Sequence, residues 1–192
     1  MKKTSRIRAI ATGAFALVAA MGLVGCSTTV EPAEDSGANM ADLMFVQMMI
    51  PHHEGAIEMS DLLLAKSGID SEVIELAEQI KAAQAPEIEQ MEAWLDDWGI
   101  PQMGGMGGMD HGGMGGMDGM TEEDMEALEN ASGSEAAELF LRQMIVHHEG
   151  AIDMAQLVLD DGEHPGVRQL VDSIIVSQTA EIAQMRSMLA SR

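Results

Sequence analysis

Two nearly identical segments of the chain each contain a pair of adjacent histidines. The first reads MMIPHHEGAIEM (residues 48–59) and the second reads QMIVHHEGAIDM (residues 143–154). Imidazole nitrogen and thioether sulfur occur together in both segments, and this combination suits soft ions such as Cu(I) better than hard ones. Chance does not repeat HHEGAI within 192 residues. Each copy therefore carries half of one site, or it is a structural element of a duplicated fold.

Helical periodicity places both histidines of each pair on the apolar side of their segment. At about 100° per residue, His52 and His53 fall within the apolar stripe with Met49 between them. Glu54 faces solvent in the same count, so general-base chemistry by this residue on a bound ion is poorly supported. The second segment repeats the pattern.

The segments downstream of each histidine pair carry a complementary feature. IKAAQAPEIEQMEAWL (80–95) and IIVSQTAEIAQMRSML (174–189) each place one Gln and one Glu on an otherwise apolar face. Burying a carboxylate without a partner is costly, so we expect Glu87 and Glu181 to accept the second N–H of histidine rings. The predicted metal-binding layer comprises His52, His53, Met49, Met59, Glu87 and Met91 from the first half and His147, His148, Met144, Met154, Glu181 and Met185 from the second. A hydrogen-bonded polar layer without metal is the alternative.

A methionine- and glycine-rich segment, PQMGGMGGMDHGGMGGMDGM at residues 101–120, separates the two halves. Its thioethers suit Cu(I) or Ag(I), and its glycines predict no regular structure over residues 104–119. The candidate ligands in this segment are Met103, Met106, Met109, His111, Met114, Met117 and Met120. A flexible linker of biased composition is the alternative.

Long helices are needed to bring these ligands together. Apolar periodicity and stop signals predict four long helices and one short helix: residues 40–66, 70–98, 122–130, 134–160 and 165–190. Residues 40–98 form a first helical hairpin, and residues 122–192 contain a second, so the chain is predicted to be an all-α, antiparallel four-helix bundle. We expect both interhelix turns at one end of the bundle, which would bring the polar groups into one layer. The linker (99–121) would then cross only the opposite end, between the second and third long helices.

The N-terminus carries the features of an exported protein. Four basic residues precede an apolar run that ends at LVGC, a sequence similar to a bacterial lipobox. We interpret residues 1–25 as a lipoprotein signal peptide, Cys26 as the lipid-carrying residue at the outer face of a bacterial membrane, and residues 26–39 as a flexible tether. A secreted protein with one free thiol is the alternative.

The charge balance narrows the choice of partners. Removal of the signal peptide leaves 6 Lys and Arg against 32 Asp and Glu, a formal charge of −26. Such a surface repels nucleic acid and concentrates cations. We therefore expect a metal ion as a partner, a membrane contact through the lipid on Cys26, and no nucleic acid.

These motifs resemble the domain of unknown function 305 family, a bacterial ferritin-like group. The resemblance rests on the two HHEGAI segments, the downstream Q-x-x-E-I-x-Q-M segments and the lead-in EEDMEALENASG. It implies a ferritin-like bundle and an exported or lipid-anchored protein, and it associates the histidine pairs with copper. The second copy has Gln143 and Val146 where the first has Met48 and Pro51, so the two half-sites need not be equivalent.

Three classes of function fit these features. We favour a protein that binds or buffers copper as Cu(I), without catalytic residues, and iron or zinc are the alternative metals. A ferritin-like di-metal oxidoreductase is the second class, although the Glu-x-x-His motifs of such sites are lacking. The third class is a non-catalytic scaffold with a polar His, Glu and Gln core layer.

Overall fold

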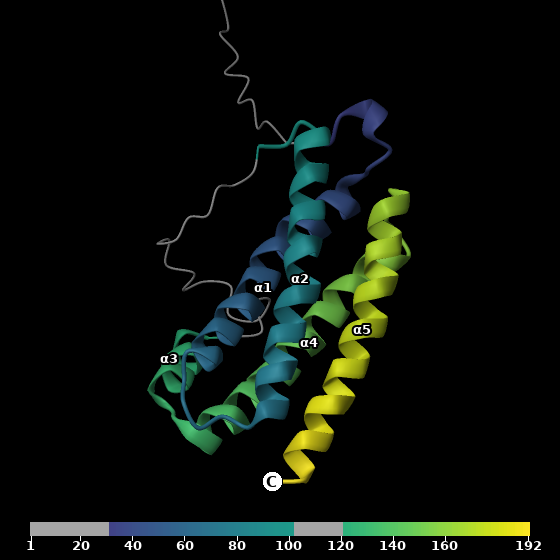
Figure 1. The fold of residues 1–192 in the computed structure, drawn as a ribbon. Helices are drawn as coiled ribbons and strands as arrows, with labels where there is room; N and C mark the ends of the chain where they lie inside the picture. Colours follow the sequence, from purple (N-terminus) through teal and green to yellow (C-terminus); the bar gives the residue numbers. More distant parts are fainter. Residues whose placement is uncertain (1–30, 102–120) are drawn as a thin grey trace, which may run out of the picture.

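The computed structural model describes residues 31–101 and 121–192, and within these ranges its regular structure is entirely helical (Figure 1). Four long helices form two hairpins, which confirms the prediction of an all-α bundle built from two helical hairpins. The first hairpin joins α1 (Met40–Leu64) to α2 (Ser71–Asp97), and the second joins α4 (Gly133–Leu159) to α5 (Pro165–Ala190). A short helix, α3 (Glu122–Asn130), precedes α4, and a 3-10 turn (Glu34–Ser36) precedes α1.

Local signals in the sequence account for the helix ends. Asn39 begins α1 with a capping box, in which its side chain accepts the N–H of Asp42 and the Asp42 carboxylate accepts the N–H of Asn39. Gly68 adopts a φ of 77° in the turn between α1 and α2, a conformation that favours glycine. Pro165 occupies the first turn of α5, where its missing N–H is no loss.

The two interhelix turns lie at opposite ends of the bundle, and the expectation that both lie at one end is wrong. At one end, Asp42 at the start of α1 accepts the N–H groups of Glu163 and His164 from the α4–α5 turn, each at 3.0 Å. At the other end, Asp70 beside the α1–α2 turn accepts a hydrogen bond from Arg192 at 2.6 Å. Helix α1 therefore runs antiparallel to α4, and α2 runs parallel to α4.

This connectivity changes what the linker has to do. Helix α2 ends beside the tether, where Ala33 donates to the Trp98 carbonyl at 3.2 Å, whereas α4 begins at the opposite end of the bundle. The connection between the hairpins therefore spans the bundle's length, roughly 40 Å for a 27-residue helix. The expectation that it crosses only one end is corrected, and a single long crossover is a feature of ferritin-like bundles.

The hydrophobic core is divided into two clusters. One contains Ala56, Met59 and Leu63 of α1 together with residues from α2, α3, α4 and α5. The other contains Leu43, Phe45, Val46 and Met49 of α1 with residues from α2, α4 and α5. The two clusters are separated along α1 by His52 and His53, so the histidine pair occupies a polar layer within an apolar interior.

Several predictions concern residues outside the described ranges. They are the signal peptide (1–25), the lipid on Cys26, the first part of the tether, and the methionine-rich ligands Met103, Met106, Met109, His111, Met114, Met117 and Met120. Within the described part of the chain, no helix has both the length and the apolar character needed to cross a bilayer.

The Asp42 contacts lead to a prediction about stability. Asp42 is fully buried, and its Oδ2 accepts hydrogen bonds from Asn39, Glu163 and His164. Asp42→Ala would leave N–H groups of the α4–α5 turn without a partner, and we expect a loss of about 3 kcal/mol in the free energy of unfolding. Urea denaturation would measure it.

Asp124→Ala is the matched control for Asp42→Ala. Asp124 closes the same kind of capping box on α3 with Thr121, but its carboxylate makes none of the contacts between hairpins that Asp42 makes. We expect its loss to be about 1 kcal/mol. Equal destabilisation by the two variants would contradict the assignment of Asp42 as the tie between the hairpins.

Candidate metal centre

His52 and His147 form a ring pair where α1 crosses α4. Their ring centroids are 3.7 Å apart with an angle of 40° between the planes, and each residue is 1 % exposed. Both nitrogens of both rings lack a hydrogen-bond partner among the described residues. Buried polar atoms are normally paired, so four unpaired ring nitrogens at one point indicate a place where an external ligand could be accepted.

The glycine of each HHEG motif faces a histidine ring of the opposite helix. A Cβ built on Gly55 of α1 would lie 3.5 Å from Nε2 of His147, and one built on Gly150 of α4 would lie 3.4 Å from Nε2 of His52. Each histidine therefore lies against the glycine of the opposite helix. Both distances are ordinary van der Waals contacts, so a methyl group would also fit at these positions. We did not predict the contact, although the glycine inside each helix was visible in both copies of the sequence.

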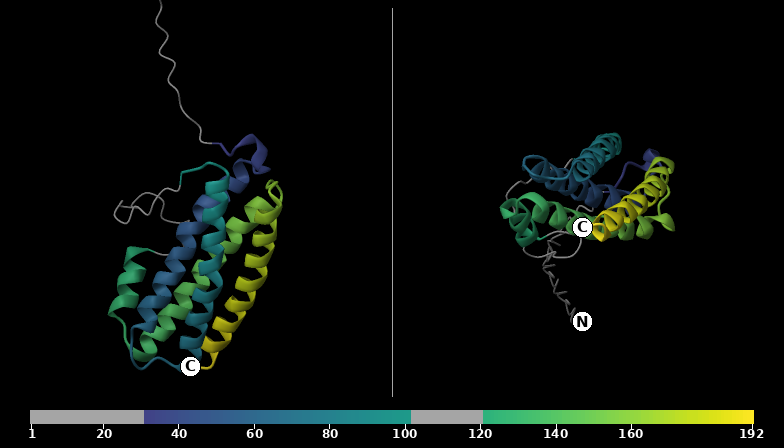
Figure 2. Two further views of the ribbon diagram at one scale, coloured as in Figure 1. Left: turned by 45° about the horizontal axis from the view of Figure 1, so that its top comes forward. Right: turned by 60° about the horizontal axis from the view of Figure 1, so that its bottom comes forward.

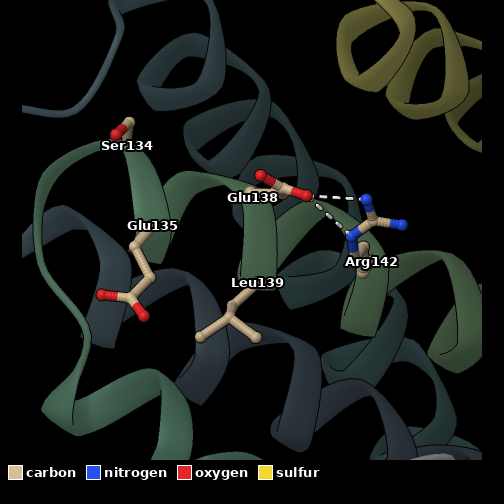
Figure 3. A pocket seen from close by; sticks show the side chains of 5 residues that line it. All are labelled: Ser134, Glu135, Glu138, Leu139 and Arg142. Carbon is tan, nitrogen blue, oxygen red and sulfur yellow. Dashed lines mark hydrogen bonds and ion pairs between the residues drawn. The ribbon is translucent and has the colours of Figure 1, made fainter. Parts of the chain in front are cut away.

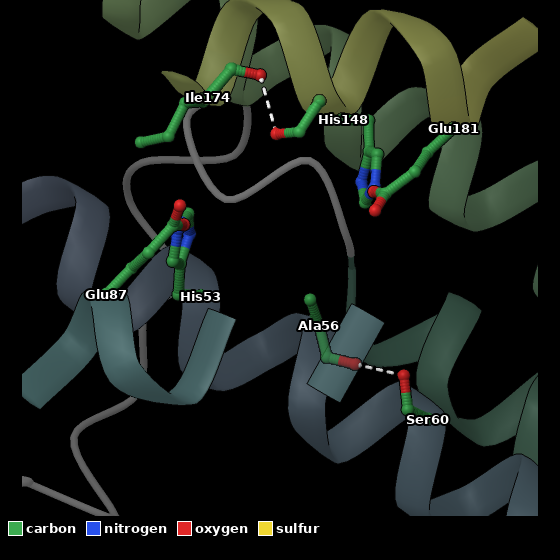
Figure 4. A network of polar contacts seen from close by, with 8 residues as sticks. His53, Ala56, Ser60, Glu87, His148, Ile174 and Glu181 are labelled. Carbon is green, nitrogen blue, oxygen red and sulfur yellow. Dashed lines mark hydrogen bonds and ion pairs between the residues drawn. The ribbon is translucent and has the colours of Figure 1, made fainter. Parts of the chain in front are cut away.

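The second histidine of each motif pairs with a carboxylate of its own hairpin. Nε2 of His53 lies 2.7 Å from Oε2 of Glu87, and Nε2 of His148 lies 2.5 Å from Oε2 of Glu181 (Figure 4). Both histidine side chains are fully buried, whereas the carboxylates are 20 % and 18 % exposed. Glu87 and Glu181 thus contact histidine as predicted, and a ring that donates Nε2–H leaves the Nδ1 lone pair free.

Burial makes the central ring pair difficult to protonate. It lowers the pKa of His52 to about 3, with smaller contributions from the nearby His53 and His148 rings. Burial likewise holds the pKa of His147 well below its usual range, with further lowering by the neighbouring histidines. Both rings are therefore neutral at physiological pH, which is the form that binds metal.

The six predicted methionine ligands of the helices lie on both sides of the histidine layer. Met59, Met144 and Met185 belong to the core cluster on one side. Met49, Met91 and Met154 belong to the cluster on the other side. Each group draws on both halves of the chain, and all six side chains are at most 7 % exposed.

Two glutamines add buried amide groups to the interior. Gln84 and Gln178 are each 2 % exposed, and their side-chain oxygens have no hydrogen-bond partner among the described residues. Their inward orientation agrees with the helical count, but they were not among the predicted ligands.

The predicted ligands do not form one ready-made cage. Within residues 31–101 and 121–192, no three or more His, Cys, Asp or Glu side chains surround a common point suited to an ion. The histidines are instead held as one central ring pair and two carboxylate-linked rings.

A surface depression elsewhere on the bundle is not part of this centre. It lies near the start of α4 and is lined by Ser134, Glu135, Glu138, Leu139 and Arg142 (Figure 3). Arg142 donates to Glu138 there at 2.6 Å. None of the predicted ligands lines this depression.

The lowered pKa values predict a pH dependence of the metal-free protein's stability. An unfolded chain protonates its histidines near pH 6.5, whereas folded His52 does so only near pH 3. The unfolded state therefore binds more protons below pH 6.5, and the free energy of unfolding should fall as the pH is lowered from 6.5 toward 3. His52→Gln with His147→Gln should reduce this slope by up to two protons.

Urea denaturation at a series of pH values would measure the slope. His164→Gln is the control because His164 lies at the start of α5, outside the histidine layer. A slope in the double variant that equals that of the unchanged protein would contradict the buried, neutral state of the ring pair.

Known structures share this architecture along most of the chain. A DUF305 fragment from Deinococcus radiodurans is 33 % identical with a TM-score of 0.71, and the match covers 81 % of this chain and 99 % of that one. A putative secreted DUF305 protein from Streptomyces coelicolor is 34 % identical with a TM-score of 0.70, covering 79 % and 93 %. CopM in its Cu(I)-bound form is 34 % identical with a TM-score of 0.64, covering 78 % and 96 %. CopM is also known in Cu(II)-bound and Ag-bound forms.

Two sequence comparisons complete this picture. The uncharacterised protein L153 of Acanthamoeba polyphaga mimivirus is 40 % identical over 53 residues, which span 28 % of this chain and only 35 % of that protein. Residues 42–189 match the family model described as Domain of unknown function (DUF305). This match takes in all four long helices almost completely, and the chain therefore belongs to the DUF305 family.

Proposed function

We propose that the protein is an extracytoplasmic lipoprotein that binds and buffers copper as Cu(I) in the histidine layer of its bundle. The observation that carries this proposal is the His52–His147 pair, whose four ring nitrogens are buried and unpaired. The copper- and silver-bound forms of CopM, which is 33–35 % identical to this chain, support the choice of metal.

The chemistry of the interior favours a soft monovalent ion. Neutral imidazole and thioether ligands can bind Cu(I) without bringing a negative charge into the apolar core. His52 and His147 would supply nitrogen ligands, and Nδ1 of His53 and of His148 could add two more. The methionine groups on the two sides of the layer would offer sulfur.

The two glutamates have a supporting role in this proposal. Because Glu87 and Glu181 accept Nε2–H of His53 and His148, they would fix the tautomer that leaves Nδ1 available to the ion. They would also orient the rings, because each carboxylate holds its ring from the adjacent helix of the hairpin.

The N-terminal sequence of the chain and its acidic surface suit a location outside the cytoplasm. A signal peptide over residues 1–25 and a lipid on Cys26 would hold the bundle at the outer face of a bacterial membrane. The acidic surface would raise the local concentration of cations, and the methionines of residues 103–120 would capture the soft ones. The secreted relative from Streptomyces coelicolor supports export.

A non-catalytic scaffold with a polar core is the second candidate. It is favoured by the His53–Glu87 and His148–Glu181 pairs, in which Nε2 of each ring has a carboxylate partner without metal. It leaves the unpaired nitrogens of His52 and His147 unexplained. The two candidates therefore predict different effects on Cu(I) binding when this ring pair is removed.

The first test removes the ring pair. His52→Ala with His147→Ala should abolish tight Cu(I) binding, measured anaerobically by competition with a chromogenic Cu(I) chelator on the mature protein. Replacing the six methionines of residues 103–120 by Ser, which keeps the length of the connection, should leave the tight site in place and remove only weaker binding. Because burial keeps His52 and His147 unprotonated well below pH 6.5, affinity at the ring pair should change little as the pH falls through 6.5.

His164→Ala is the control for the ring pair because it removes a histidine that lies outside the layer. The helical content and the midpoint of thermal unfolding of each variant would establish that it is folded. A folded double variant that keeps the full Cu(I) affinity would show that the layer is structural.

The second test addresses the glutamates. Glu87→Gln with Glu181→Gln removes the charged acceptors and keeps the side-chain size, and we expect Cu(I) affinity to fall about 10- to 100-fold. The same competition assay would measure it. Glu54→Gln is the matched control, because this glutamate follows the first histidine pair but faces outward. An unchanged affinity in the Glu87/Glu181 variant would contradict the orienting role.

A further inference from the structure

A row of methionines on α1 leads from the protein surface to the central ring pair. Met40, Met44, Met48 and His52 follow one another at intervals of four residues. Side chains four residues apart are neighbours on a helix, with Cβ atoms about 5–6 Å apart. Each step also rotates the row by about 40° around the helix. The row therefore turns progressively from one side of α1 to another.

The exposed fractions of the side chains in the row fall from Met44 to His52. Met40 is 40 % exposed and Met44 is 53 % exposed, Met48 is partly buried, and His52 is 1 % exposed. The last member is also the side chain whose two ring nitrogens lack a partner among the described residues. The exposed thioethers are thus connected, one helical turn at a time, to an unpaired buried ligand.

The second half of the chain has no such row. At the corresponding positions of α4, His147 is preceded by Glu135, Leu139 and Gln143. Gln143 is buried, and its Nε2 donates to the Asp124 carbonyl of α3 at 2.8 Å. The approach to His147 therefore has no thioether at these positions.

Helix α3 covers only one of the two approaches. It packs against both α1 and α4 at the end of the bundle where the C-terminus lies (Figure 2). In the first repeat, the segment before α1 is the sequence counterpart of α3. This segment is instead hydrogen-bonded to the end of α2, through Ala33 and Trp98. In the described part of the chain, Met40 and Met44 consequently stay open to solvent.

We propose that Met40, Met44 and Met48 bind a soft monovalent cation, Cu(I) or Ag(I), at the surface and deliver it to His52. Thioether sulfur is the side-chain ligand that such ions prefer, and an unbranched, flexible methionine side chain can turn toward either neighbour. Delivery is a ligand exchange from sulfur to imidazole nitrogen, with no change in the charge of the ion. The delivery step rests on the proposed function of the histidine layer.

The binding step can be tested by nuclear magnetic resonance. The mature protein with ¹³C-labelled methionine methyl groups and histidine rings would be titrated with Ag(I), which does not oxidise. The methyl signals would be assigned through Met→Leu variants and the ring signals through His→Gln variants. We expect the methyl signals of Met40, Met44 and Met48 to shift together as Ag(I) is added. The Met125 signal from α3 is the internal control, because Met125 lies outside the row.

The same titration separates this inference from the proposed function. Shifts of the His52 and His147 ring signals without any shift of the three methyl groups would overturn the methionine site and leave the histidine site standing. Shifts of the three methyl groups with silent ring signals would support the surface site and overturn delivery, together with the proposed function.

The delivery step can be tested by kinetics. Met40→Leu, Met44→Leu and Met48→Leu together remove the sulfurs but keep apolar side chains with a good helix propensity. The affinity of the histidine layer should stay unchanged at equilibrium. Loading should become about tenfold slower, because the row no longer raises the local ion concentration. Stopped-flow loading with Ag(I) would measure it, with Met125→Leu as the matched control, and an unchanged rate would overturn delivery.

Discussion

The crossing of α1 and α4 is the contact on which the rest of the structure depends. It brings His52 and His147 to a centroid distance of 3.7 Å, with each ring lying against a glycine of the opposite helix, Gly55 or Gly150. Two imidazoles in such contact cannot both be protonated, since two adjacent positive charges in an apolar core would be prohibitively unfavourable. Burial also lowers the pKa of each ring, so the close approach of the two helices favours the neutral form of both rings.

The layer contains two kinds of histidine, which differ in whether a carboxylate holds the ring. His53 and His148 are anchored by partly exposed carboxylates, which fix the rings from outside the core and give each Nε2 a partner. His52 and His147 have no such anchor among the described residues and lie between the two methionine-containing clusters. Unpaired donors and acceptors destabilise a core. The free energy of unfolding is therefore lower than it would be with paired rings, and the nitrogen lone pairs of the two rings stay available.

Much of this arrangement could be predicted from the sequence, and the misses have a physical reason. The 3.6-residue periodicity and the capping signals were local, so the helices and the inward direction of the histidines followed from them. Which end of the bundle each turn occupies depends on contacts far apart in the chain, such as Asp42 with Glu163 and His164, and no local signal reports it. The layer was predicted despite the wrong connectivity because His52 lies at the midpoint of α1 and His147 near that of α4. Midpoints coincide whether two helices run parallel or antiparallel.

The internal repeat makes the core nearly symmetric, but the surface is not. The equivalent methionines Met49 and Met144 occupy equivalent places on opposite sides of the histidine layer. Outside this layer, Gln143 stands in the second repeat where the first has Met48, and its side chain is hydrogen-bonded to α3. A duplicated hairpin first supplies two identical half-sites. Equivalent histidines of the two copies can then lie opposite each other where the two helices cross. Substitution outside the core can then make the two approaches different without disturbing the ring pair, because surface positions tolerate change that a packed interior does not.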